Sequence, residues 1–168
     1  MKQVYLDNAA TTPMSPTVID VIADEMANDF GNASSTHTLG RKARNSVETA
    51  RHTIAQAINA KDQEIIFTSG GSESNNTVIF GVAEMQKTIG RHLITTKIEH
   101  ESVLKSMQHL EEMGYEVTYL DVDRDGHISL DQLREAIRPD TILVSVMAVN
   151  NEVGSINPLK DIGQIVKD

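Results

Sequence analysis

The stretch Phe67-Thr-Ser-Gly-Gly-Ser-Glu-Ser-Asn-Asn76 decides how this 168-residue chain is built. It follows a strand-like run at residues 64–68 and opens a run of helical character. A strand that breaks at glycines and restarts as a helix leaves unpaired N–H groups aimed at one point, where the helix dipole favours an anion. The stretch therefore predicts a site for a phosphate-carrying small molecule. The alternative is a tight turn closed by a serine cap. Its glycine spacing fits neither the dinucleotide pattern nor the nucleotide P-loop.

Strand-like and helix-like runs alternate after residue 60. The β-type runs lie at residues 64–68, 92–96, 115–120 and 141–147. The helical runs lie at residues 72–87, 102–113, 129–137 and 158–167. This alternation predicts an α/β fold with a mostly parallel sheet flanked by helices on both faces. Ligands of such sheets bind beyond the carboxyl ends of the strands, so residues there are the first candidates for function.

The N-terminal third has a different pattern. Residues 1–14 form one segment. It consists of a strand-like arm, Gln3–Leu6, followed by a turn of small residues. Ser15 and Pro16 are typical of a helix start, and Val18, Ile22 and Met26 give that helix one apolar face. A second helix is predicted at about residues 38–59. Its apolar stripe consists of Ala43, Val47, Ala50, Ile54 and Ala57.

Composition narrows the classes of function. A net charge of −9 disfavours non-specific binding to nucleic acid or to anionic membranes. No apolar stretch approaches the length of a membrane span. The N-terminus has no apolar signal region, which favours a cytoplasmic location. The chain contains no cysteine, which excludes disulfides, thiolate metal sites and a cysteine nucleophile within these residues.

Three further segments carry candidate residues. His100 follows a strand and precedes a helix, so it can act as an acid or base or stack on a planar ligand; the alternative is a surface histidine near a helix start. Asn150 and Asn151 follow the run 141–147, which is apolar enough to predict a central strand, and they can bond a ligand's hydroxyl group or satisfy loop backbone. His37 and Arg41 can bind a partner chain's ligand or simply begin a helix.

Residues Asp121–Gln132 imitate a calcium-binding loop. Their acidic and glycine positions match the EF-hand pattern, but Gln132 stands where a bidentate glutamate belongs. The preceding run, residues 115–120, is strand-like, whereas an EF-hand needs an entering helix. We interpret the segment as a strand–turn–helix connection and predict no metal site; a divalent-cation module is the alternative.

Five segments together resemble one family, the cysteine desulfurases of the class V aminotransferase group. They occur in the family's order and are Tyr5–Thr12, Asn32–Arg41, Phe67–Glu73, Glu99–Leu104 and Val149–Gly154. The form of Glu99–Leu104 is closer to the NifS/IscS-type branch than to the SufS-type branch. The resemblance implies the large domain of a fold-type-I enzyme that uses pyridoxal 5′-phosphate (PLP). Residues 15–168 would be the first part of that domain, and residues 1–14 an arm near the active-site edge.

The resemblance also implies a reaction and roles for individual residues. The enzyme would convert L-cysteine to L-alanine and pass the sulfur, as a persulfide, to an acceptor such as an iron–sulfur scaffold protein or a tRNA thiolation pathway. Gly71 and Ser72 would bind the cofactor phosphate, and His100 would stack on the pyridine ring and move protons. Asn151 would bond the 3-oxygen of the ring. The residues near the substrate would be Asn8, Ala9, Ala10 and Thr11.

Four features of the family have no matching position in this sequence: the Schiff-base lysine, the aspartate that pairs with the pyridine nitrogen, the persulfide cysteine and the small C-terminal domain. Asp168 is the last residue and cannot be assigned as that aspartate. We therefore expect this polypeptide alone to be inactive. We also expect an exposed apolar edge or face that invites a homodimer or a complementing chain. The alternatives are another class V aminotransferase and a non-catalytic scaffold or binding module.

Overall fold

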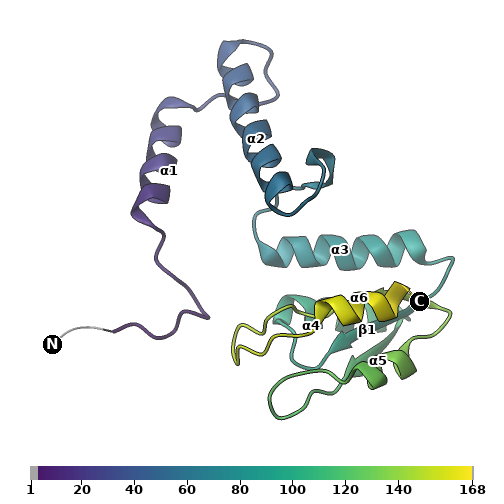
Figure 1. The fold of residues 1–168 in the computed structure, drawn as a ribbon. Helices are drawn as coiled ribbons and strands as arrows, with labels where there is room; N and C mark the ends of the chain where they lie inside the picture. The colour runs from purple at the N-terminus through teal and green to yellow at the C-terminus, as the bar shows by residue number, and fades with distance from the viewer. Residues whose placement is uncertain (1–3, 168) are drawn as a thin grey trace. The chain divides into compact units, whose positions relative to one another are not determined.

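The computed structural model describes residues 4–167 (Figure 1). Their contacts divide the chain into two compact units, with the boundary in the sequence between Phe67 and Thr68. The first unit contains α1 (Pro16–Asn28), α2 (Thr38–Ala57) and a short 3₁₀ helix, η1 (Asp62–Glu64). The second contains all three strands and the remaining four helices of the described residues. Each unit is described by itself.

In the first unit, α1 begins as its sequence predicts. Ser15 Oγ accepts a hydrogen bond from the backbone N–H of Val18, and Pro16 occupies the first helical position. No residue of α1 is buried, and its apolar side chains Val18, Ile22 and Met26 are exposed. The second predicted helix is confirmed as α2. Most of its expected stripe is exposed as well, and the buried residues of α2 are Gly40 and Ala55.

Two predicted strands of this unit are wrong. Residues 4–6 have no regular structure, and Gln3 lies outside the described residues. Residues 64–68 form the end of η1 and an irregular segment. The guanidinium group of Arg51 donates to the carbonyl oxygen of Ile65 and lies 5.0 Å from the centroid of the Phe67 ring. The β-type side chains are present here, but the local backbone carbonyl bonds a side chain instead of a neighbouring strand.

The second unit is built around a parallel three-stranded sheet. Its strands are β1 (His92–Thr96), β2 (Glu116–Leu120) and β3 (Thr141–Val144), in the order β2-β1-β3. Each lies inside a run predicted from the sequence, but the run at residues 141–147, predicted as a central strand, forms the edge strand β3, and β1 is central. The register pairs His92 with Glu116 and Thr96 with Leu120. All carboxyl ends therefore point the same way, and the central β1 delivers its last residues to the middle of that edge.

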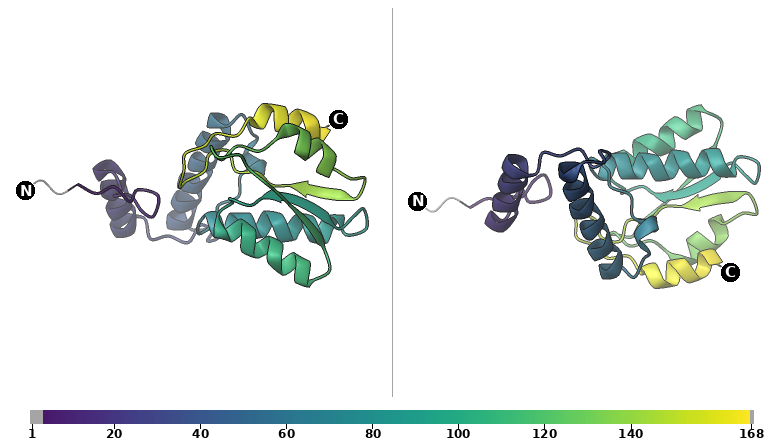
Figure 2. Two further views of the ribbon diagram at one scale, coloured as in Figure 1. Left: turned by 90° about the horizontal axis from the view of Figure 1, so that it is seen from below. Right: turned by 90° about the horizontal axis from the view of Figure 1, so that it is seen from above.

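Four helices cover the two faces of the sheet (Figure 2). They are α3 (Gly71–Gln86), α4 (Glu101–Glu112), α5 (Leu130–Ala136) and α6 (Leu159–Lys167). Successive residues of a strand point to opposite faces. Leu93 accordingly packs with α3 and α4, whereas Ile94 packs with α5 and α6. These two buried clusters form the core and confirm the predicted α/β/α arrangement.

A buried histidine links all three strands near their starts. Nδ1 of His92 lies 2.7 Å from Thr141 Oγ1, and Nε2 lies 2.8 Å from Thr118 Oγ1. The side chain has no solvent exposure. Burial, and then the positive charge of Arg138, lowers the pKa of His92. The neutral ring can donate to one hydroxyl and accept from the other, which suits this position.

Candidate functional site

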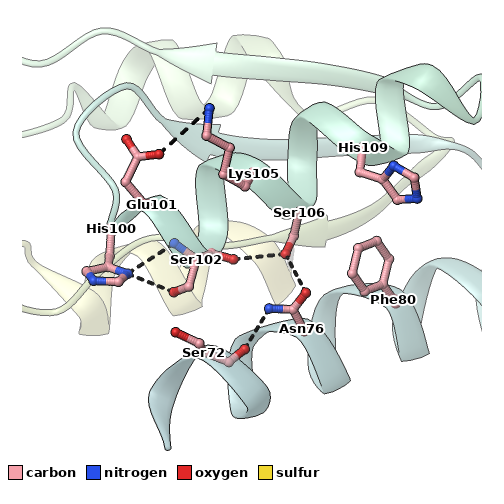
Figure 3. A pocket seen from close by; sticks show the side chains of 9 residues that line it. All are labelled: Ser72, Asn76, Phe80, His100, Glu101, Ser102, Lys105, Ser106 and His109. Carbon is pink, nitrogen blue, oxygen red and sulfur yellow. Dashed lines mark hydrogen bonds and ion pairs between the residues drawn. The ribbon is translucent and has the colours of Figure 1, made fainter.

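A pocket of about 550 Å³ lies along α3 and α4, and its lining runs from Ser72 to Phe80 on α3 and from His100 to His109 at the start of α4 and along it. Ser72 contributes to it from α3, and His100 contributes from the residue that caps α4 (Figure 3). The remaining lining residues are Asn76, Phe80, Glu101, Ser102, Lys105, Ser106 and His109. The structure thus brings together two of the residues that the sequence singled out, from segments 28 positions apart.

The first turn of α3 is open to a ligand. Gly70 precedes the helix in an extended conformation. The backbone hydrogen bonding of the helix begins with the N–H of Ser74, which donates to the Gly70 carbonyl oxygen. The N–H groups of Gly71, Ser72 and Glu73 therefore have no acceptor within the helix. A Cβ atom added at Gly70 or Gly71 would meet nothing within 4 Å, so the backbone is accessible from outside. This is the geometry of an anion site.

Glu73 shapes the same turn without occupying that site. Its Oε2 accepts from the Ser69 backbone N–H at 2.7 Å and from Ser69 Oγ at 2.5 Å. These two hydrogen bonds lower the pKa of Glu73, so the carboxylate is held in its charged form. The turn is closed by a glutamate and a serine in addition to the glycines.

His100 caps α4 with its imidazole ring. Nδ1 accepts a hydrogen bond from the backbone N–H of Ser102 at 3.0 Å. The alternative interpretation of His100, a residue near a helix start, therefore describes its local geometry correctly. The same residue also lines the pocket that Ser72 lines, so its capping role and the proposed ligand role are compatible.

Two buried polar side chains, Glu99 and Asn150, join the segment before His100 to the loop after β3, and we call them the Glu99–Asn150 latch. Glu99 Oε1 accepts from the Met147 backbone N–H at 2.7 Å and from Thr96 Oγ1 at 3.2 Å. Asn150 Nδ2 donates to the Ile98 carbonyl oxygen at 2.9 Å. Glu99 and Asn150 are both buried, and burial raises the pKa of Glu99. The latch fixes the backbone from which His100 projects.

The two asparagines predicted as a pair have separate environments. Asn150 Oδ1 accepts from the backbone N–H groups of Glu152 and Val153, which is the loop-satisfying role. Asn151 is exposed and donates to Glu152 Oε1 at 3.1 Å. It does not line the pocket shared by Ser72 and His100. Its assignment to a ring oxygen therefore stays a prediction.

The candidates of the first unit form local structures. Asn8, Ala9, Ala10 and Thr11 are exposed, in a turn where the Ala10 and Thr11 N–H groups donate to the Asp7 carbonyl. His37 caps α2 by accepting from the Gly40 N–H at 3.4 Å. Arg41 donates to the Thr36 carbonyl at 2.6 Å. The helix-start interpretation of His37 and Arg41 fits these contacts, and the substrate role of residues 8–11 stays a prediction.

The segment that imitates a calcium loop is a strand–turn–helix connection, as its flanks predict. It leaves β2, forms an antiparallel bridge between Val122 and Ile128, and enters α5. Asp123 Oδ1 accepts from the backbone N–H groups of Asp125 and His127 at 2.9 Å, and these bonds lower the pKa of Asp123. Residues 4–167 contain no group of three or more acidic, histidine or cysteine side chains placed to hold a metal ion. Over the same residues, no helix combines the length and apolar character that a membrane crossing requires.

Sequence reasoning missed the polar residues that join α3 to α4. Asn75 Nδ2 donates to Ser102 Oγ at 2.8 Å, and Ser106 Oγ donates to Asn76 Oδ1 at 3.2 Å. Ser102 and Ser106 lie four apart on α4, and Ser106 is buried like the apolar Met107 beside it. A serine in the buried stripe of an amphipathic helix was the signal available in the sequence.

The chain is similar to known proteins over almost its whole length. The model of the aminotransferase class-V family matches residues 4–168. The chain is 50% identical over 168 residues to a putative cysteine desulfurase IscS 1 of Bacillus subtilis, covering 100% of this chain and 44% of the relative. It is 50% identical over 167 residues to the cysteine desulfurase IscS of Dictyoglomus turgidum, covering 99% and 42%. It therefore spans less than half the length of these relatives.

Solved structures give the same result. A NifS-like protein superposes with a TM-score of 0.96 at 40% identity, covering 99% of this chain and 46% of that one. The structure titled SspA in complex with cysteine superposes with a TM-score of 0.90 at 42% identity, covering 95% and 46%. The family model spans both units of the chain. The chain belongs to the aminotransferase class-V family, and it corresponds to the N-terminal portion of relatives named as NifS- and IscS-type cysteine desulfurases.

Proposed function

We propose that this chain is the N-terminal portion of a PLP-dependent enzyme that removes sulfur from L-cysteine and leaves L-alanine. The single observation that carries the proposal is the pocket in which the open end of α3 and the ring of His100 meet. The names of the relatives and the cysteine in the SspA structure support the choice of substrate.

The residues present fit this cofactor. The accessible N–H groups of Gly71 and Ser72, with the Ser72 hydroxyl beside them, suit a phosphate ester. His100 supplies a planar ring at the same pocket. We assign Asn151 to the 3-oxygen of the cofactor ring and residues 8–11 to the substrate side. When bound, PLP supplies an electron sink for the carbanion formed at the amino acid.

The chain's own residues then have distinct tasks. The first turn of α3 neutralises phosphate charge through its dipole and its N–H groups. His100 accepts the Ser102 N–H at Nδ1, so its proton is on Nε2, where it can be exchanged with a bound molecule. The Glu99–Asn150 latch keeps the two loop segments in register, so that the ring does not drift from the anion site.

The wider assignments follow from the same proposal. We propose that the sulfur passes to a protein acceptor of iron–sulfur cluster assembly or of tRNA thiolation, on the ground of the IscS-type relatives. We also propose a homodimer or a complementing chain, because the exposed apolar side chains of α1 need a partner surface.

The test uses the product of the complete gene. Incubated with L-cysteine, a thiol reductant and PLP, it is expected to release alanine and sulfide in equal amounts. The His100→Ala variant is expected to lose about 10²-fold or more in kcat, in the range of a lost general acid–base group. Transamination without sulfide release would contradict the desulfurase assignment, and a full-length product that does not bind PLP would contradict the cofactor.

A further inference from the structure

We propose that Ser102, held by Asn75, is a positioning residue that fixes the ring and the tautomer of His100. The inference deepens the proposed function, since the importance of His100 rests on it. The orientation itself follows from contacts within residues 68–167. Three atoms carry it: Nδ1 of His100, Oγ of Ser102 and Nδ2 of Asn75 (Figure 3 shows the first two).

The tautomer follows from the cap. A backbone N–H can only donate, and the N–H of Ser102 lies 3.0 Å from Nδ1 of His100. Nδ1 must therefore present its lone pair. A neutral imidazole has one protonated nitrogen, so the proton is on Nε2. The protonated Nε2 is thus the nitrogen that the contacts with Ser102 leave free.

The hydroxyl of Ser102 strengthens this choice. Its Oγ lies 2.8 Å from the same Nδ1 and 2.8 Å from Nδ2 of Asn75. The amide Nδ2 is a donor, so the hydroxyl oxygen accepts from Asn75 and its own proton is available for Nδ1. Ser102 then offers two donors to one nitrogen, and a protonated Nδ1 would lose the backbone donor and reverse the direction of the bond with the hydroxyl.

Asn75 makes this arrangement a link between two helices. It belongs to α3, one turn after Ser72, whereas Ser102 belongs to α4. The contact joins positions 27 residues apart in the chain. The helix that carries the anion site therefore also orients the histidine, and the distance between the two parts of the pocket is set by a side-chain bond.

A second link one turn away serves as an internal control. Ser106 Oγ donates to Asn76 Oδ1 at 3.2 Å and to the Ser102 carbonyl at 2.8 Å, and Asn76 donates to the Ser72 carbonyl at 2.6 Å. This link also joins α3 to α4 and is more buried, but it does not contact His100. Removing it tests the effect of loosening the helix pair without removing a donor to Nδ1.

The first measurement needs neither cofactor nor substrate. Side-chain ¹⁵N NMR of the histidine-labelled 168-residue chain, at a pH where imidazoles are neutral, reports the tautomer of each ring, and His100→Gln identifies the His100 signals. The wild type is expected to show the Nε2–H form. Ser102→Ala removes the hydroxyl and keeps the backbone donor, so it is expected to increase the minor Nδ1–H fraction, whereas Ser102→Thr and Ser106→Ala are expected to keep the wild-type fraction.

Two results would overturn the proposal: a wild-type His100 protonated on Nδ1, or Ser102→Ala signals identical to those of the wild type. Circular dichroism checks that each variant folds. Should Ser102→Ala fail to fold, Asn75→Ala removes the donor to Ser102 from the other side, and it is expected to shift the tautomer in the same direction. An unchanged tautomer in that variant would also count against the link.

The second measurement uses the full-length enzyme. Ser102→Ala is expected to lower kcat about tenfold, as for a displaced acid–base group, with KM for cysteine within about twofold. Ser102→Thr should restore the rate, and Ser106→Ala should not reproduce the split between kcat and KM. An equal loss of kcat in Ser102→Ala and Ser106→Ala would show that Ser102 only supports the packing of the two helices. If the full-length enzyme has no desulfurase activity but the NMR measurement gives the expected tautomers, the proposed function is refuted and the positioning of His100 by Ser102 stands.

Discussion

At the scale of single residues, His92 gives the protein a specific dependence on pH. Burial lowers the pKa of His92 in the folded state, while the unfolded chain titrates near about 6.5. As the pH falls through that value, the unfolded state binds a proton that the folded state resists. The free energy of unfolding is therefore expected to decrease from about pH 7 downward, until the lowered folded pKa is reached. Urea denaturation at several pH values measures this slope.

The matched variant isolates the histidine. His92→Gln cannot take up a proton, so the slope of its stability between about pH 7 and 5.5 should be shallower than that of the wild type. Its stability at pH 7 should be lower, because the hydrogen bonds of the ring to Thr118 and Thr141 are disturbed. His109→Gln removes an exposed histidine and serves as the control for replacing an imidazole by an amide. Parallel curves for His92→Gln and the wild type would show that His92 is not the titrating group.

The residue scale is also where sequence reasoning stopped short. The order of Asn150 and Asn151 in the sequence does not reveal which one is buried, because that depends on where the Ile98 carbonyl lies after folding. His100 and Ser72 were predicted as site residues because each follows a chain segment with a clear pattern. Ser102 and Asn75 were not found, because their bond joins residues 27 apart and neither residue is unusual locally.

At the scale of elements, the Glu99–Asn150 latch connects the end of β1 to the loop after β3. Two substitutions of Glu99 distinguish the effect of its charge on stability from the effect of its hydrogen bonds. Glu99→Gln keeps an oxygen that can accept from the Met147 N–H and removes a buried charge, so its stability at pH 7 is expected to be within about 1 kcal/mol of the wild type. Glu99→Ala leaves that N–H without its acceptor and is expected to cost about 1–3 kcal/mol. Urea midpoints with a common slope measure both.

The pH dependence of Glu99 has the opposite sign to that of His92. Its folded pKa is raised, so the folded state binds a proton before the unfolded state does as the pH falls. The stability relative to Glu99→Gln should therefore increase as the pH drops through the raised pKa toward about 4.5. A difference that decreases over this range would show that hydrogen bonds to the charged form outweigh burial.

The elements themselves were the most predictable part of the fold. Alternation identified β1, β2, β3 and the four helices of the second unit, because each buries a face whose period is visible in the sequence. The failed strand at residues 64–68 has the same kind of side chains. Strand formation requires a neighbouring backbone, and Arg51 takes the Ile65 carbonyl instead. Local composition contains no information about that competition.

At the scale of the whole molecule, the first unit exposes side chains that soluble proteins usually cover. Ile19 and Met26 on α1 are 51% and 76% exposed, and Phe30 just after it is 76% exposed. Apolar surface of this kind marks a site of association. The 168-residue chain is therefore expected to self-associate in a concentration-dependent way, which sedimentation velocity between about 5 and 200 µM can follow, a range chosen to bracket micromolar affinities.

A pair of substitutions on α1 decides whether this apolar face is responsible. Ile19→Lys places a charge on the face and is expected to shift the sedimentation profile toward monomer, because a desolvated ammonium group would oppose burial. Asp20→Lys changes the charge by two units at the neighbouring, polar position of the same helix and is expected to leave association in place. The surface responsible is then apolar and includes Ile19. If both variants dissociate equally, the attraction is electrostatic, and a monomeric wild type at the highest concentration would show that the exposed side chains do not drive assembly.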